Sequence, residues 1–356
     1  MDAFVYSAHP ARVIFGSGTL SQLPAEVERL GLTRVLVLST PQQEADANAT
    51  ARAISARAAG VFAGATMHTP VGVTADAMAM VADRRIDGIV AVGGGSTTGL
   101  AKAIALRTDL PQIVAPTTYA GSEMTPILGE TKEGVKTTQK SPKVLPEVVI
   151  YDVDLTLSLP PALSATSGMN AIAHAVEALY AQDRNPIFTM MAAEGIRALA
   201  SALPAIVATP GDRAARSDAL YGAWLCGMCL GAVGMALHHK LCHTLGGSFD
   251  LPHAETHTAV LPHATAYNAA AAPDAMRAIA GALETADAAQ GLYDLAGRLG
   301  AKLALRDLGM PQDGIDKAAD IAMRNPYWNP RPLERTAIRD LIARAYAGNA
   351  PQQEPA

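Results

Sequence analysis

The sequence predicts an α/β domain built on a parallel sheet, followed by a helical domain. Up to about residue 155, short apolar runs rich in β-branched residues alternate with alanine-rich segments of helical spacing. Such runs are typical of strands buried on both faces of a parallel sheet, and their alternation with helices indicates a doubly wound arrangement. Beyond residue 158 the pattern is helical almost throughout.

The first domain is expected over residues 1–158. Its strands are expected at 34–40, 88–96, 112–118 and 147–152, where the runs read RVLVLST, GIVAVGGGS, QIVAPTT and EVVIYD. Helices are expected between these strands, at 45–60 and 74–86, because both segments are rich in alanine and have helical spacing.

The second domain is expected over residues 159–350 and begins at two prolines that break the chain. Residues 219–239 have the composition of one continuous apolar helix, and 351–356 are expected to be a disordered tail. Cys226 and Cys229 lie in that helix with the CxxC spacing of zinc ligands, so a zinc–thiolate site is conceivable. The apolar surroundings favour small core residues instead.

Composition excludes several classes of function. The 356 residues are 49% apolar and 17% charged, which suits a well-buried globular enzyme, and the formal charge of -5 comes with no basic tract. We therefore expect neither nucleic acid nor an anionic membrane as the main partner. The first residues lack the pattern of a signal peptide and no run approaches 18 apolar residues, so a cytoplasmic protein without a membrane span is expected.

A glycine-rich turn follows the second expected strand. Gly93, Gly94 and Gly95 let the backbone approach a phosphate closely, Ser96 offers a hydroxyl, and a helix N-terminus follows. A tight strand–helix turn alone could also need these glycines. Thr117 and Thr118 end the next strand at the same edge of the sheet, where open α/β sheets bind ligands.

The end of the first expected strand bears on the choice of dinucleotide. NAD-selective sites often place an acid there to hold the ribose 2′-hydroxyl. This chain has Ser39 and Thr40 instead, and nothing in the sequence repels a 2′-phosphate. Both NADH and NADPH are therefore expected to be usable.

Five of the nine histidines lie within residues 238–257. His239 and His243 have i, i+4 spacing, so they share one helical face, and Asn170 and His174 repeat that spacing upstream. His253 follows ten residues after His243. Two helices that each present such a pair into one cleft would form a polar site.

These motifs resemble those of the iron-containing (type III) alcohol dehydrogenase superfamily. The stretches that carry the resemblance are GGGSTTGLAKAIA, PTTYAGSEMT, LTLSLPP, GMNAIAHAVEALY and HHKLCHTLGGSFDLPHAETHTAVLPHATAYN, in the family's order and over nearly the whole chain. The resemblance implies a Rossmann-like dinucleotide-binding domain, a helical domain, and an active site in the cleft between them, in the fold shared with dehydroquinate synthase. It also implies a homodimer.

The resemblance further implies roles for individual residues. The family's metal ligands, an aspartate and three histidines that bind Fe²⁺ or Zn²⁺, correspond to Asn170, His174, His239 and His253. His243 matches a histidine beside the nicotinamide, and Lys136 aligns loosely with a lysine near the ribose.

Departures from the family pattern point to one of its branches. Asn170 replaces the aspartate, which removes the only anionic ligand and makes a bound metal doubtful; three histidines can still hold zinc, whereas affinity for Fe²⁺ should fall. Gly99 stands where relatives often have aspartate, and PTTYAGSE is one residue shorter than the common PTTAGTGSE. These changes resemble the branch that reduces maleylacetate to 3-oxoadipate in aromatic compound catabolism.

That reaction suits a histidine-rich pocket with few acids. Hydride adds at the carbon β to the ketone, an enolate forms, and imidazole groups can stabilise it and supply the proton. His243 is the expected proton donor. Arg324 and Arg331, beside Tyr327, are candidates to bind the carboxylates of the dianionic substrate, although loop arginines in solvent are an equal alternative.

Three alternatives remain open. The first is a metal-dependent alcohol dehydrogenase acting on a small alcohol or aldehyde. A lyase of the dehydroquinate synthase type lacks the basic residues that a phosphorylated substrate needs. A non-enzymatic nucleotide-binding module is disfavoured by the histidine cluster.

Overall fold

The structure is a computed structural model that describes residues 4, 6, 12–133, 135–324 and 327–352, without the side chains of 135 and 136. The chain forms two units, which meet in sequence between Leu159 and Pro160. Residues 8–159 are called here the α/β unit and residues 160–356 the helical unit. Tyr6 belongs to the helical unit, where its ring centroid lies 5.4 Å from that of Phe188.

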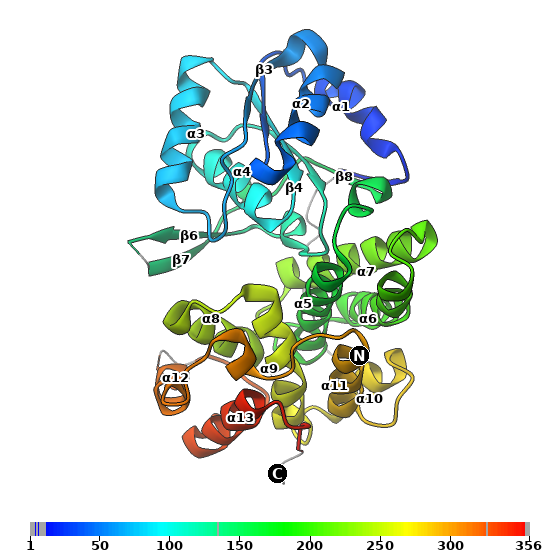
Figure 1. Ribbon diagram of the computed structural model, residues 1–356, viewed down its shortest axis with the longest axis vertical. Coiled ribbons are helices and arrows are strands. Elements are labelled where there is room, and N and C mark those ends of the chain that lie inside the picture. The colour runs from blue at the N-terminus through cyan, green and yellow to red at the C-terminus, as the bar shows by residue number, and fades with distance from the viewer. Residues whose placement is uncertain (1–3, 5, 7–11, 134, 325–326, 353–356) are drawn as a thin grey trace. The chain divides into compact units, whose positions relative to one another are not determined.

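The α/β unit contains a six-stranded parallel sheet (Figure 1). From one edge to the other, the strands are β1 (Arg12–Gly16), β8 (Val148–Asp152), β5 (Gln112–Pro116), β4 (Gly88–Gly93), β2 (Val35–Leu38) and β3 (Ala58–Phe62). All residues of β2, β4, β5 and β8 are buried, which confirms the four strands predicted from apolar runs. The order reverses between β2 and β4, so their carboxyl ends flank a topological switch point.

The two edge strands differ from the sequence prediction. β1 and β3 are mostly half-exposed, although their sequences, RVIFG and AAGVF, are largely apolar. The helix predicted over 45–60 ends at Ala53, and its last three residues form the start of β3. An antiparallel hairpin of β6 (Ile127–Lys132) and β7 (Val135–Lys140) was also not predicted.

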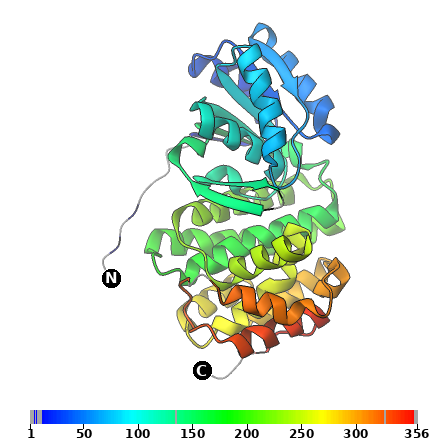
Figure 2. The same ribbon diagram turned by 90° about the vertical axis from the view of Figure 1, so that its left-hand side faces the viewer.

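Helices cover both faces of the sheet (Figures 1 and 2). They are α1 (Leu23–Arg29), α2 (Glu44–Ala53), α3 (Val71–Asp83) and α4 (Gly95–Thr108). Alternate strand residues separate into two cores: Val35 and Val37 pack with α1 and α2, whereas Leu36 and Leu38 pack with α3 and α4. This alternation confirms the doubly wound α/β class.

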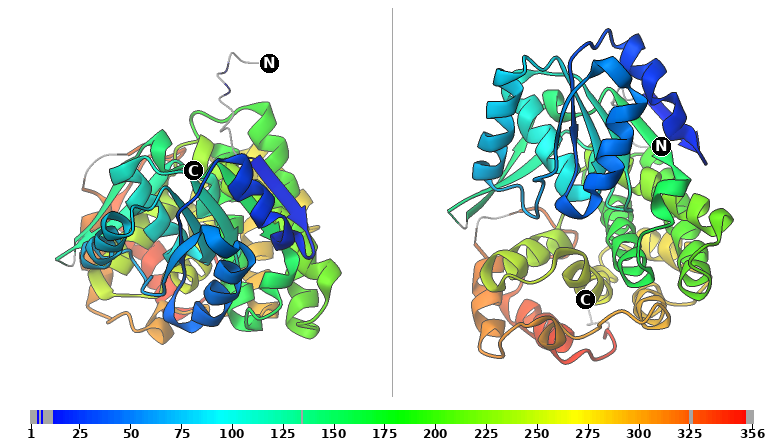
Figure 3. Two further views of the ribbon diagram at one scale, coloured as in Figure 1. Left: turned by 90° about the horizontal axis from the view of Figure 1, so that it is seen from above. Right: turned by 45° about the horizontal axis from the view of Figure 1, so that its top comes forward.

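The helical unit is built from stacked helices (Figure 3). They are α5 (Pro161–Tyr180), α6 (Pro186–Ala208), α7 (Arg213–Ala232), α8 (Leu237–Phe249), α9 (His253–Asn268), α10 (Pro273–Ala282), α11 (Ala288–Arg298), α12 (Gly314–Ala322) and α13 (Arg335–Ala347). Helix α5 is buried along nearly its whole length. Glycines let α6 and α7 approach closely, since a Cβ on Gly195 would lie 3.2 Å from the carbonyl oxygen of Gly222.

Short 3₁₀ turns connect several of these elements. They lie at Thr19–Gln22, Pro41–Gln43, Ser55–Arg57, Ser122–Met124, Pro142–Val144, Val153–Thr156 and Leu305–Leu308.

The continuous helix predicted over 219–239 is wrong. The chain breaks between Ala232 and Leu237, and α7 and α8 meet at 94°. Cys226 and Cys229 are buried free thiols on α7, and burial raises the pKa of Cys229 to about 12 and that of Cys226 well above its usual value. Neutral thiols in such surroundings agree with the core role and disfavour the zinc–thiolate alternative.

Helix α6 is long and apolar enough to cross a membrane by length and composition alone, although the sequence suggested no such run. It lies against α5 and α7 within the helical unit and contributes buried residues such as Leu199 and Leu203 to the interior. The apolar composition of α6 is therefore explained by its position in the core of the helical unit.

Candidate functional site

The glycine turn connects β4 directly to α4. A Cβ on Gly93, where φ is +158°, would lie 2.3 Å from Thr97 Oγ1, and one on Gly94 would lie 2.8 Å from Thr118 Cγ2. Thr97 and Thr98 donate their N–H groups to the carbonyl of Gly94. The N–H groups of Gly95 and Ser96 precede these bonds at the helix N-terminus, where a phosphate can bind.

Three loops meet at the switch point beside this turn. The N–H of Thr117 donates to the carbonyl of Gly93 at 3.1 Å, and the Gln43 side chain donates to Thr117 Oγ1, also at 3.1 Å. Thr40 Oγ1 lies 3.4 Å from Gln43 Oε1, whereas Ser39 is fully buried. Of the two predicted ribose-edge residues, Thr40 is therefore the better placed, and Gln43 is a connecting residue that the sequence analysis missed.

Lys102 is a second residue that the sequence analysis missed. It lies on α4 with its Nζ buried, 2.6 Å from the Thr125 carbonyl and 3.0 Å from the Ile127 carbonyl, and it also donates to the carbonyl of Ser122. Burial lowers the pKa of Lys102 to about 7, and the Glu123 carboxylate opposes this effect. Lys102 thus connects α4, the helix after the glycine turn, to the loop after β5 through hydrogen bonds.

Two further positions were predicted at this end of the chain. Lys136 lies on β7, and its side chain is outside the described part of the structure. At Gly99, a Cβ would lie 2.4 Å from Thr69 Oγ1, so the aspartate common in relatives would not fit here without movement of Thr69.

Helix α5 carries a polar row on one face of the helical unit. Asn170, His174 and Glu177 follow the i, i+4, i+7 spacing and are all buried. Glu177 is another residue that the sequence analysis missed, although its spacing from His174 places it on the same face. Its pKa is raised by burial, against the opposing effect of His238 and of hydrogen bonds from the Ala236 and His238 N–H groups.

The predicted histidines come together in one cluster. The ring centroid of His239 lies 5.3 Å from that of His174 and 6.3 Å from that of His243, and the His243 ring stacks on His253 at 6.4 Å. His257 occupies the middle, with its centroid 5.0 Å from His239 and 4.3 Å from His253. The sequence analysis did not include His257 in the site, although it follows His253 by one helical turn.

The inner histidines are neutral at physiological pH because burial penalises the imidazolium form. Burial, with the neighbouring His243, lowers the pKa of His239 to about 3, and burial lowers that of His238 to about 4. The pKa values of His174 and His257 fall well below the usual value for the same reason. His243 and His253 are exposed on the surface of the unit.

The donor atoms of this cluster fit a metal ion of intermediate softness. His238, His239 and His257 offer ring nitrogens that lie within 4.8 Å of one another. Asn170 Oδ1, His174 Nδ1 and His239 Nε2 are buried and have no hydrogen-bond partner among the described residues. These donors are neutral nitrogens and an amide oxygen, so they suit Zn²⁺ better than Fe²⁺.

The loop predicted to bind the substrate carboxylates is anchored beside α8. Asn329 accepts from the N–H of Leu237 at 3.4 Å and donates to Asn268 at 2.7 Å, and Lys240 Nζ lies 5.5 Å from the Tyr327 ring centroid. The guanidinium of Arg331 stacks 4.4 Å from the Tyr267 ring centroid. The structure thus places Tyr327 against α8, whereas Arg331 packs on α9 and Arg324 is exposed.

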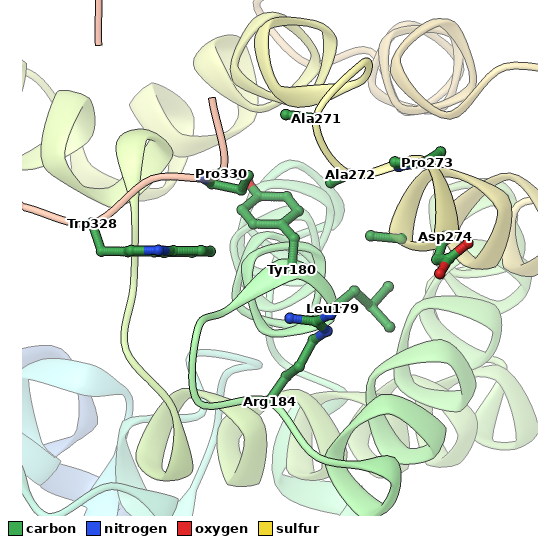
Figure 4. A pocket seen from close by; sticks show the side chains of 10 residues that line it. Leu179, Tyr180, Arg184, Ala271, Ala272, Pro273, Asp274, Trp328 and Pro330 are labelled. Carbon is green, nitrogen blue, oxygen red and sulfur yellow. The ribbon is translucent and has the colours of Figure 1, made fainter. Parts of the chain in front are cut away.

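A cavity of about 280 Å³ is lined in part by the same loop (Figure 4). Trp328 and Pro330 line it together with Tyr180 at the end of α5, Arg184 in the turn before α6, and the start of α10. Tyr180 lies one turn beyond Glu177 on α5. The cavity was not predicted from the sequence.

Comparisons with known proteins agree with this architecture. The family models for iron-containing alcohol dehydrogenase and for the C-terminal region of Fe-containing alcohol dehydrogenases match residues 10–153 and 164–346. Maleylacetate reductase of Rhizobium sp. (strain MTP-10005) is 59% identical over 352 residues, which cover 99% of this chain and 100% of that protein.

Solved structures give the same result. Maleylacetate reductase from Agrobacterium tumefaciens superposes with a TM-score of 0.96 at 59% identity, covering 99% of this chain and 100% of that one. An iron-containing alcohol dehydrogenase from Corynebacterium glutamicum ATCC 13032 superposes with a TM-score of 0.93 at 43% identity, covering 100% of this chain and 98% of that one. The chain belongs to the iron-containing alcohol dehydrogenase family of oxidoreductases.

Proposed function

We propose that the chain reduces the conjugated C=C bond of maleylacetate to give 3-oxoadipate, with NADH or NADPH as hydride donor. The observation that carries the proposal is the identity of residue 170. Asn170 lies in one row with His174 and Glu177 on α5, and metal-dependent members of the family have an aspartate at the position of Asn170. The site of this chain therefore offers an amide at that position, beside buried neutral imidazoles, and its buried carboxylate, Glu177, is bonded to His239. Relatives of 52–59% identity over the full length carry the name maleylacetate reductase.

The reaction requires one hydride and one proton. Hydride leaves the nicotinamide for the alkene carbon β to the ketone, the C=C electron pair moves toward the ketone oxygen, and the carbon α to the ketone then takes a proton. His243 is the proposed donor of that proton, because it is exposed at the edge of the cluster whereas His174 and His239 are buried. Proton transfer of this kind contributes about 10²–10⁴-fold to a rate.

The inner cluster holds the substrate's polar groups. Asn170 adds no negative charge, so a dianionic substrate meets less repulsion than an aspartate would produce. A divalent ion held by His174, His239 and His253 would supply Lewis-acid polarisation of an oxygen atom. The proposal that Arg324, Tyr327 and Arg331 bind the carboxylates has its best support at Tyr327, which lies against α8.

Use of both dinucleotides has support at the end of β2. Thr40 lies beside the Gln43 bridge, and the strand is followed by Pro41 and two glutamines before the first acid, Glu44. No carboxylate follows the strand directly to select NADH by repelling a 2′-phosphate. We further infer a homodimer, which sedimentation equilibrium of the purified protein tests, and a cytoplasmic location, which cell fractionation tests.

The decisive experiment follows NADH absorbance with freshly generated maleylacetate, with and without a strong chelator. Oxidation that resists the chelator supports the reductase with a metal-free mechanism. Oxidation that the chelator abolishes and zinc or iron restores supports the reductase with a bound metal. Absence of NADH oxidation without chelator, with chelator, and after addition of zinc or iron overturns the proposal.

The alternative function is a metal-dependent alcohol dehydrogenase acting on a small alcohol or aldehyde. The cluster of histidine nitrogens favours it, as does the likeness to a chain named iron-containing alcohol dehydrogenase. Stoichiometric bound metal together with alcohol-dependent reduction of NAD⁺ would establish it.

A further inference from the structure

We propose that Glu177 is a positioning residue that holds His239 in the tautomer protonated on Nδ1, so that Nε2 presents a lone pair to the site. Glu177 thereby makes His239 Nε2 a proton acceptor. The role is separate from the hydride transfer itself, because Glu177 is fully buried and acts through the imidazole.

Three donors converge on the Glu177 carboxylate. Oε2 accepts from the N–H of Ala236 at 2.8 Å and lies 2.7 Å from His239 Nδ1, while Oε1 accepts from the N–H of His238 at 2.8 Å. A carboxylate that receives backbone N–H groups on both oxygens acts as an acceptor. This geometry assigns the hydrogen of the third bond to Nδ1 of His239.

The other nitrogen of the ring follows from this assignment. In the neutral imidazole, a hydrogen on Nδ1 leaves Nε2 with a lone pair. His239 Nε2 is buried and lacks a hydrogen-bond partner within the described part of the chain. It can therefore accept an O–H hydrogen bond or bind a cation, but it cannot donate a proton to an enolate.

The consequence for the reaction rests on the proposed function. If His239 is an acceptor, the proton for the α carbon comes from another group, and His243 is the exposed histidine on the same helix. The same carboxylate also fixes where α8 begins, since its partners Ala236 and His238 flank the first helical residue. Orientation of the ring and placement of the helix are thus linked through one side chain.

The first test is ¹⁵N NMR of histidine-labelled enzyme, in which long-range proton couplings distinguish the two tautomers. His239 is assigned by the signals that disappear in His239→Gln. We expect the Nδ1–H tautomer in the unmodified protein. An Nε2–H tautomer overturns the proposal, whether or not the enzyme reduces maleylacetate, so failure of the proposed function remains distinguishable.

The second test is Glu177→Gln, because an amide has one acceptor oxygen where the carboxylate has two. The tautomer is then no longer fixed, so an Nε2–H population should appear and kcat should fall about 10- to 100-fold, as for other residues that orient a ligand. KM for NADH should not change. Glu26→Gln, at a carboxylate buried in the α/β unit, is the matched control.

A helix-capping role alone predicts a different result. In that case Glu177→Gln lowers the melting temperature but leaves the tautomer and kcat unaltered, which overturns the positioning role. Should this variant fail to fold, the NMR spectrum of the unmodified protein still decides the matter.

Discussion

Nζ of Lys102 lies 2.6 Å from the carbonyl oxygen of Thr125, within hydrogen-bond distance. Lys102 is on the helix that follows the glycine turn, and Thr125 is in the loop that follows β5. The bond and its neighbours therefore hold together two segments that flank the expected phosphate site.

Lys102→Met should destabilise the α/β unit and weaken cofactor binding. The carbonyl of Thr125 loses the Lys102 donor, at a cost of about 1–3 kcal/mol for a buried group left unpaired, whereas the carbonyl of Ser122 keeps the N–H and the hydroxyl of Thr125 as donors. Urea unfolding measures the stability, and steady-state kinetics should show a larger change in KM for NADH than in kcat. Lys132→Met, at an exposed position on β6, is the control. Unchanged unfolding of Lys102→Met would contradict the structural role of the lysine.

Gly94→Ala should raise KM for NADH. The added Cβ would lie 2.8 Å from Thr118 Cγ2, and overpacking of this kind costs about 1–3 kcal/mol, which would correspond to about 5- to 150-fold if it acted wholly on binding. Gly72→Ala on α3 is the matched control, because its Cβ would meet nothing within 4 Å. Equal KM values for the two variants would refute a phosphate-binding role for the turn.

Asn170→Asp should increase metal affinity and slow the reductase. A carboxylate restores an anionic ligand beside His174, and it repels a dianionic substrate. Calorimetric titration with zinc and the rate of maleylacetate reduction measure the two effects. Asn185→Asp, at the N-cap of α6, is the control because aspartate caps a helix as well as asparagine does. Zinc affinity equal to that of the unmodified protein would show that residue 170 does not face a metal.

The stability of the helical unit should fall in acid partly because of His263. Burial and the charge of Arg344 lower the pKa of His263 to about 4, whereas an unfolded histidine titrates near 6.5. Between these values the unfolded state binds more protons, so stability decreases as pH falls, by at most about 1.4 kcal/mol per pH unit. Denaturant unfolding of His263→Gln should show a smaller loss between pH 6.5 and 4. An identical pH dependence in the two proteins would contradict the burial of a neutral His263.

The parts of the fold that the sequence predicts are those in which burial is uniform. Leu36 and Val37 lie in a strand covered on both faces, so every residue there is apolar and the strand is recognisable. β3 lies at an edge and is half-exposed, and its Ala-Ala-Gly start was indistinguishable from the end of a helix. The sequence of β3 is apolar and rich in alanine, so composition alone did not separate this strand from the helix before it.

The parts of the site that were missed depend on contacts distant in sequence. The break between α7 and α8 coincides with the bond from the Ala236 N–H to Glu177, which is 59 residues earlier. Glu177 itself lies on an apolar helix, and only the folded structure shows that its carboxylate meets His239. The i, i+4 pairs of histidines were recognisable because one helical face is a local property. His257 follows His253 on α9 at the same spacing and could have been included, whereas its contact with His239 of α8 is not a local property.

His243→Gln should reduce kcat about 10²–10⁴-fold, because the site loses its proposed proton donor. The substitution should leave NADH binding, measured by fluorescence titration, almost unaffected. His243 is exposed and stacks on His253 at a centroid distance of 6.4 Å, so its replacement creates no cavity in the core, and the melting temperature should change little. His68→Gln, at an exposed histidine of the α/β unit, controls for loss of a surface imidazole.

The decisive measurement for His243→Gln is single-turnover oxidation of NADH in H₂O and in D₂O. A slow step with a large solvent isotope effect in the variant means that water has replaced the histidine as proton donor. Turnover near the unmodified rate would transfer the donor role to another group, and His253 would be the next histidine to replace.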